Sequence, residues 1–90
     1  MSGREQADDY SGFVAQLAPR WRVVRCRDGI QWILQRRHDR RKAGEGNWEG
    51  DSYCRSRDGL IAVIRRRNKV PDADPEAMKV IAALPEWIEE

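Results

Sequence analysis

Residues 21–37 read WRVVRCRDGIQWILQRR, and this stretch decides the fold. At its centre an Asp-Gly pair at positions 28 and 29 separates two runs that are rich in Trp, Val, Ile and Leu. Asp-Gly between two such runs is among the strongest sequence signals for a two-residue β-hairpin turn. The opposed pairs are then Arg27 with Ile30, Cys26 with Gln31, Arg25 with Trp32, Val24 with Ile33 and Val23 with Leu34. The sequence therefore predicts an antiparallel hairpin with a defined register.

The predicted register assigns each side chain of the hairpin to one of two sides, because facing residues share a side of the sheet. The first side consists of Trp21, Val23, Arg25, Ile30, Trp32 and Leu34. The second side consists of Arg22, Val24, Cys26, Gln31, Ile33 and Gln35. Neither side is purely apolar. The first side has more aromatic surface, so we expect it to meet the helices, with guanidinium groups lying on Trp rings or reaching out at the edge.

The hairpin belongs to a predicted three-stranded sheet. Residues 36–47, RRHDRRKAGEGN, are polar and contain two glycines, which favours a loop. A third strand is predicted over 48–55, and three successive strands favour an antiparallel meander. Before the hairpin, apolar residues at helical spacing predict a short helix over 11–18. We expect residues 1–10 to form a flexible tail and residues 11–90 to form a single domain.

Two further helices are predicted after the third strand. Ser56 is a suitable N-cap for a helix that runs to about Arg67. The run DPE at 74–76 combines a cap, a first-position proline and a first-turn acid, so it begins a second helix, which Pro85 ends. The predicted fold class is α+β: a three-stranded antiparallel β-meander with two C-terminal helices packed on one face and a short N-terminal helix.

Composition excludes several classes of protein. The chain has two cysteines and one histidine, fewer than the four ligands of a structural zinc site, so we expect no metal and no cofactor. The N-terminus is polar and lacks the apolar core of a signal peptide, which favours a cytoplasmic protein with two buried, inert thiols. The longest apolar run, LIAVI at 60–64, is too short to span a bilayer, and no catalytic signature is present.

Charge is divided unevenly along the chain. The formal net charge is only +2, but residues 19–70 contain thirteen Arg and two Lys against six acids. Acidic residues are in excess in both 1–18 and 71–90. A basic middle between acidic ends predicts a surface that attracts anions, provided that the fold separates the two kinds of charge.

The densest cationic stretch lies in the predicted loop. Guanidinium groups bind phosphates through paired hydrogen bonds, so such a loop favours contact with a nucleic-acid backbone. The loop candidates are Arg36, Arg37, Arg40, Arg41 and Lys42, together with His38. Arg65 and Arg66, at the end of the first predicted C-terminal helix, can extend the same surface. Alternatively the loop is a solvated hairpin tip, the helix arginines serve only the helix dipole, and the Arg bias reflects a GC-rich genome.

Aromatic residues allow two interpretations. Trp32, Trp48 and Tyr53 lie on predicted strands among arginines, a pattern that can form a stacking platform for single-stranded nucleic acid. Alternatively they form the core, since the chain has few Leu and Ile residues. Cys26 and Cys54, on separate predicted strands, are candidates for neighbouring thiols.

The stretch WRVVRCRDGIQWILQRR, followed by SYCRSRDGLIAVIRR, resembles short proteins found in proteobacterial and prophage genomes. The resemblance covers about residues 20–67. It implies a small bacterial or phage accessory protein and assigns no site residue. Small phage proteins often bind and inhibit host complexes, so the resemblance raises a second hypothesis beside nucleic-acid binding.

The sequence thus predicts a non-catalytic binding or regulatory protein that contacts the phosphates of DNA or RNA through its basic loop. The alternative is a phage-type inhibitor or adaptor that binds a host protein complex, such as a defence complex, with Arg and Trp as interface hot spots. Neither hypothesis involves a membrane. The chain is expected to be a monomer or a homodimer joined through an exposed sheet edge.

Overall fold

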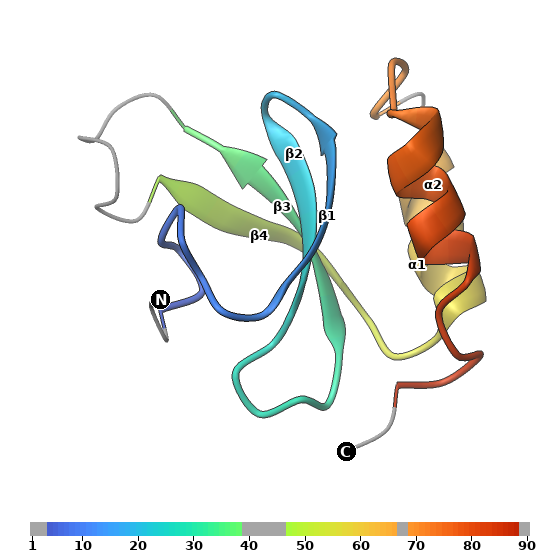
Figure 1. Ribbon diagram of the computed structural model, residues 1–90, viewed down its shortest axis with the longest axis horizontal. Coiled ribbons are helices and arrows are strands. Elements are labelled where there is room, and N and C mark those ends of the chain that lie inside the picture. The colour runs from blue at the N-terminus through green and yellow to red at the C-terminus, as the bar shows by residue number, and fades with distance from the viewer. Residues whose placement is uncertain (1–3, 39–46, 67–68, 89–90) are drawn as a thin grey trace.

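The computed structural model describes residues 4–38, 47–66 and 69–88 of the 90-residue chain. It is an α+β fold with one antiparallel sheet in the order β1-β2-β3-β4, and both helices lie on the same side of that sheet (Figure 1). The strands are β1 (Phe13–Ala18), β2 (Trp21–Arg25), β3 (Trp32–Arg37) and β4 (Trp48–Cys54). The helices are α1 (Arg57–Arg65) and α2 (Pro75–Ala82). The predicted class is confirmed, but the sheet has four strands where three were predicted.

The additional strand is β1, so the helix predicted over 11–18 is wrong. Residues Phe13–Ala18 pair antiparallel with β2, and two register shifts interrupt the pairing. Ala15 and Leu17 are buried at the two-residue spacing of a strand. The shifts and the small alanine side chain obscured this alternation in the sequence, and the remaining apolar residues fell at a helical spacing.

The hairpin register is confirmed. Arg25 pairs with Trp32, Val24 with Ile33 and Val23 with Leu34. The turn differs from the two-residue form, because the Gly29 N–H donates to the carbonyl of Cys26 at 3.0 Å. The tight turn therefore spans 26–29, and Gly29 takes the left-handed φ of 69°. The Cys26 N–H still donates to the carbonyl of Gln31 at 2.9 Å, so the loop as a whole stays centred between Asp28 and Gly29 and the strands keep the predicted register.

The main core lies between the helices and one face of the sheet, which we call the first face. Val23, Trp32 and Leu34 are buried on this face, as predicted from its aromatic content. The helices contribute Leu60, Ile64, Ala77 and Ile81 to the same cluster. Each of these residues removes apolar surface from water, which is the main stabilising term for a sheet-and-helix layer. Within the described residues no helix is long and apolar enough to cross a membrane.

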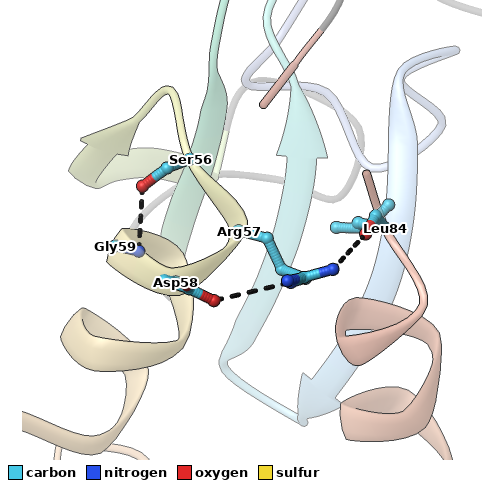
Figure 2. Close-up of polar contacts among 5 residues, drawn as sticks. All are labelled: Ser56, Arg57, Asp58, Gly59 and Leu84. Carbon is cyan, nitrogen blue, oxygen red and sulfur yellow. Dashed lines mark hydrogen bonds and ion pairs between the residues drawn. The ribbon is translucent and has the colours of Figure 1, made fainter. Parts of the chain in front are cut away.

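Both helices begin where the sequence predicted. The Ser56 hydroxyl accepts a hydrogen bond from the Gly59 N–H at 3.0 Å, and Asp74 caps α2 by accepting from the Ala77 N–H at 2.9 Å. Figure 2 shows that Arg57, in the first turn of α1, donates to the carbonyl of Leu84 beyond the end of α2, at 3.1 Å. The start of α1 is thereby tied to the chain that leaves α2.

The opposite face of the sheet, the second face, is covered by residues 4–12, which we call the N-terminal segment (Figure 1). A flexible tail was expected over residues 1–10, yet residues 4–10 pack against the sheet. Tyr10 is buried with Val24, Cys26 and Ile33 in a second apolar cluster, and its hydroxyl donates to the carbonyl of Arg25 at 2.7 Å. The sheet is therefore covered on both faces.

Arg22 holds the N-terminal segment in place. Its side chain is 2% exposed, and it donates to the carbonyls of Glu5, Ala7 and Asp8 at 2.8–3.2 Å. Its Nε donates to Gln35 Oε1 at 2.7 Å. Burial lowers the pKa of Arg22 to about 10, so the guanidinium stays protonated at neutral pH. One buried cation thus donates to three backbone carbonyls, beside the Gln35 amide, which donates to the Glu5 carbonyl, and the Tyr10 N–H, which donates to the Ala7 carbonyl.

The indole of Trp48 completes this arrangement. The Arg22 guanidinium lies 4.3 Å from the centre of the Trp48 ring, and Trp48 Nε1 donates to Asp8 Oδ1 at 2.9 Å. The charge is therefore stabilised by a ring face and by a nearby carboxylate as well as by hydrogen bonds. Trp48 is 5% exposed, so its predicted role in the core is confirmed.

Replacing Arg22 with Met should destabilise the protein by about 3–5 kcal/mol, because buried acceptors lose their donor. Urea unfolding followed by circular dichroism measures the change. Arg27→Met is the matched control, since Arg27 is exposed, and it should change the free energy of unfolding by less than about 0.5 kcal/mol. Equal midpoints for the two variants would contradict a central role for Arg22.

Replacing Gly29 with Ala should destabilise the hairpin by about 1–2 kcal/mol, because an L-residue is strained at positive φ. Gly29→Asn should lose less stability than Gly29→Ala, since Asn tolerates the left-handed region better than Ala does. Thermal unfolding of both variants tests the turn geometry. An Ala variant as stable as the Asn variant would count against it.

Candidate nucleic-acid interface

The predicted site residues lie in two regions of the fold. Arg36 and Arg37 are the last residues of β3, with Arg36 exposed and Arg37 half-buried. Arg40, Arg41 and Lys42 lie outside the described residues. Arg65 and Arg66 are exposed at the C-terminal end of α1.

The two loop arginines at the end of β3 belong to opposite faces of the sheet. Arg36 pairs with Trp21 of β2 and lies on the first face, with its guanidinium 6.0 Å from the centre of the Trp21 ring. Arg37 pairs with Trp48 of β4 and alternates to the second face. The adjacent arginines therefore do not act as one patch, and only Arg36 lies on the same side as the helices.

Asp51 connects Arg36 with the chain that follows α1. Asp51 occupies a register shift in β4, where the pairing moves from Leu34 to Gln35. Its carboxylate accepts a hydrogen bond from Lys69 Nζ at 2.7 Å. Burial alone would raise the pKa of Asp51, but hydrogen bonds from Lys69 and Ser52, with the charge of Lys69 and then of Arg36, hold it below its usual range.

The residues after α1 bring the helix arginines to the same end of the molecule. The Lys69 N–H donates to the carbonyl of Arg66 at 3.0 Å, so Lys69 lies within one turn of the helix end. Neither Arg65 nor Arg66 forms an ion pair with any residue that the structure describes. We call Arg36, Arg65, Arg66 and Lys69 the basic surface. Two segments distant in sequence, the end of β3 and the end of α1 with the residues after it, are linked in this surface through the Asp51–Lys69 pair.

Acidic residues reduce the charge at the edge of this surface. His38 Nε2 contacts Glu49 Oε2 beside Arg36, and a hollow of about 130 Å³ lies among Arg36, His38, Glu49, Gly50 and Asp51. The carboxylate of Asp51 likewise offsets the positive charge of Lys69. The positive charge available to a ligand therefore rests chiefly on the arginines.

An apolar groove of about 340 Å³ opens next to the basic surface. One wall is the turn between β1 and β2 and carries Arg20 and Trp21; the other is the chain after α1 and carries Val70, Pro71 and Asp72. Sequence reasoning missed this groove, because it assigned Trp21 to the helix-facing side and could not place residues 70–72 against it. Trp21 is half-buried, and the groove that it lines exists only where the β1–β2 turn lies beside residues 70–72.

Tyr53 differs from the other aromatic candidates. Trp32 and Trp48 are buried, which confirms the core interpretation for both. Tyr53 is 59% exposed, and its hydroxyl would clash with any side chain at position 50, so the ring extends over Gly50. The absence of a side chain at Gly50 thus allows an aromatic ring to lie on the outside of β4.

The two cysteines are free thiols on opposite faces of the sheet. Cys26 is buried in the cluster under the N-terminal segment, whereas Cys54 packs against the helix-covered core. Burial raises the pKa of Cys54, which lowers the fraction of reactive thiolate at neutral pH. The sheet therefore separates two thiols that the sequence made candidates for neighbours.

Comparison of this chain with protein-family models, with curated proteins and with solved structures finds no match.

The Asp51–Lys69 pair should contribute stability that depends on pH. Because the folded pKa of Asp51 is depressed, this contribution is complete above the unfolded value of about 3.9 and is lost as pH falls through the folded value. Lys69→Met should be less stable than wild type by up to about 1 kcal/mol at pH 7, and the difference should shrink at pH 3. Urea unfolding at both pH values measures it.

The control for this prediction is Lys79→Met, which removes an exposed pair with Glu76 on α2. The free energy of unfolding of Lys79→Met should differ little from that of wild type at both pH values. A Lys69→Met difference of the same size at pH 7 and pH 3 would contradict the assigned role of Asp51.

Proposed function

We propose that this protein is a small cytoplasmic binding protein that contacts the phosphate backbone of nucleic acid through its basic surface and the adjoining loop. The observation that supports the proposal is the Asp51–Lys69 pair, which joins the β4 bulge near Arg36 of β3 to the chain that follows Arg65 and Arg66 of α1. Arg40, Arg41 and Lys42, outside the described residues, follow Arg36 in the sequence and belong to the predicted loop. Arg65 and Arg66 form no ion pair with described residues, so their guanidinium groups remain available for an anion.

Phosphate binding follows from this arrangement for two physical reasons. Arginine presents a planar set of donors that matches phosphate oxygens, and it remains charged at any physiological pH. Each neutralised phosphate releases condensed counterions, which favours binding at low salt. The cations of the basic surface contact phosphates rather than base edges, so the proposal does not include sequence specificity.

The second candidate is a protein-binding function, such as inhibition or adaptation of a host complex by a phage-type protein. The observation that favours it is the exposure of two large aromatic side chains, Trp87 at 62% and Tyr53 at 59%. Exposed Trp and Tyr residues are enriched among the hot spots of protein interfaces. This candidate predicts that a host partner stays bound after nuclease treatment.

The leading proposal predicts that the triple variant Arg36→Ala/Arg65→Ala/Arg66→Ala binds nucleic acid more weakly and with a smaller salt dependence. The log–log slope on duplex DNA should fall by about 0.9 for each phosphate contact that is lost. Fluorescence anisotropy with labelled duplex and single-stranded oligonucleotides, at two salt concentrations, measures both quantities.

The matched control is Arg25→Ala/Arg27→Ala/Arg55→Ala. It removes the same charge from the other end of the sheet, since the register places Arg25 and Cys54 opposite Trp32, far along β3 from Arg36. The control should retain most of the affinity. Equal losses in both triple variants would point to net charge alone, and an absence of binding even at low salt would refute the proposal.

Replacing Arg36, Arg37, Arg40, Arg41 and Lys42 with Ala tests the loop itself. The variant should lose binding. Retained affinity, together with a loss in the Arg36/Arg65/Arg66 variant, would assign the contact to the helix end.

A further inference from the structure

The groove beside Trp21 has the composition of a site for a flat, partly apolar group. Its walls are formed by Ala18, Pro19, Arg20, Trp21, Val70, Pro71 and Asp72. Its volume of about 340 Å³ is at the lower end of the range of small-molecule sites, about 300–1,000 Å³. A groove of this size accommodates one ring system, and its aromatic wall favours a ring that can stack.

Charge around the groove is arranged asymmetrically. The Trp21 wall carries Arg20 in the groove and Arg36 against the Trp21 ring, whereas the opposite wall carries Asp72. Val70 and Pro71 also line an adjoining hollow of about 250 Å³ that contains Arg65. One arginine therefore lines the groove, two more lie beside it, and the carboxylate of Asp72 lies on the far wall. An occupant with an anionic end and a ring with hydrogen-bond donors complements this arrangement.

We infer that the groove takes an unpaired base of single-stranded nucleic acid, with the backbone phosphates on the side of Arg20 and Arg36. The inference rests on the proposed function and specifies its ligand as single-stranded. In a duplex the bases are stacked and paired, whereas a single strand can place a base on an aromatic side chain. The carboxylate of Asp72 repels phosphate and accepts hydrogen bonds from a base amino group, such as N4 of cytosine.

An apolar peptide is a poorer fit to the same groove. Desolvating three arginines beside an apolar side chain is unfavourable without anionic groups to pair with them. A nucleotide supplies both the ring and the anion in one unit. The charge of the groove therefore favours the nucleic-acid occupant over a peptide.

The experiment compares a short single-stranded oligodeoxycytidylate with an abasic oligonucleotide of the same length, which keeps the phosphates and lacks the bases. Stacking of one base on an aromatic side chain strengthens binding by about 5- to 150-fold. Wild-type protein should therefore bind the oligodeoxycytidylate at least about 5-fold more tightly than the abasic strand. Fluorescence anisotropy at low salt measures both affinities.

Variants then locate the base. Trp21→Leu removes the stacking surface and should abolish the difference between the two strands, while Trp87→Leu, which removes an exposed tryptophan elsewhere, should preserve it. Pro71 lines the groove and is exposed, so Pro71→Gln places a longer side chain at the groove without altering the core. It should abolish the difference even if Trp21→Leu does not fold.

Each outcome decides between the two proposals. Equal affinity of wild type for both strands overturns the groove inference and leaves phosphate binding intact. A difference that persists in Pro71→Gln places the base elsewhere and also overturns it. A failure of both strands to bind at low salt refutes the proposed function, and the groove inference with it.

Discussion

The buried guanidinium of Arg22 is the interaction on which the rest of this structure depends. Helices α1 and α2 cover only one face of the sheet, and the other face is covered by a segment without regular secondary structure. Such a segment brings backbone carbonyls into the interior with no strand or helix to pair them. Arg22 supplies donors to three of these carbonyls, Gln35 supplies another, and the Trp48 ring lies against the charge of Arg22. Arg22 is thereby the centre of the contacts that let a chain of 90 residues cover both faces of its sheet.

Local sequence determined the fold where a strong local signal was present. The tripeptide Arg-Asp-Gly occurs at 27–29 and at 57–59, as a turn in the first case and as the first turn of a helix in the second. The preceding residue distinguishes them, because Ser56 caps the helix with its hydroxyl while Cys26 closes a strand pair (Figure 2). Strand β1 had no such signal, since bulges interrupted the alternation of buried and exposed side chains along it. Burial of Arg22 was also hidden, because its donors meet carbonyls that no side-chain pattern reveals.

The candidate site was predictable only in its parts. Arg36, Arg65 and Arg66 stood out as cations in the sequence, but their convergence depends on the Asp51–Lys69 pair, which joins a strand bulge to the chain after α1. The groove at Trp21 depends in the same way on two segments about fifty positions apart. The alternation of a strand explains why Arg36 and Arg37, neighbours in sequence, lie on opposite faces. Charge counts identify an anion-binding tendency, whereas topology decides which cations share a surface.

The N-terminal segment also bears on the order in which the chain folds. Every strand pair of the sheet joins neighbours in sequence, so the sheet can assemble by successive short loop closures. Covering the second face requires Glu5 to meet Gln35, thirty positions away, through a polar contact, with Tyr10 as the main apolar residue that the segment contributes. Long closures with little apolar gain form late and open first. The segment held by Arg22 is therefore expected to be the last part of the protein to dock and the first to detach, exposing Val24 and Ile33 while the helix-covered core stays intact.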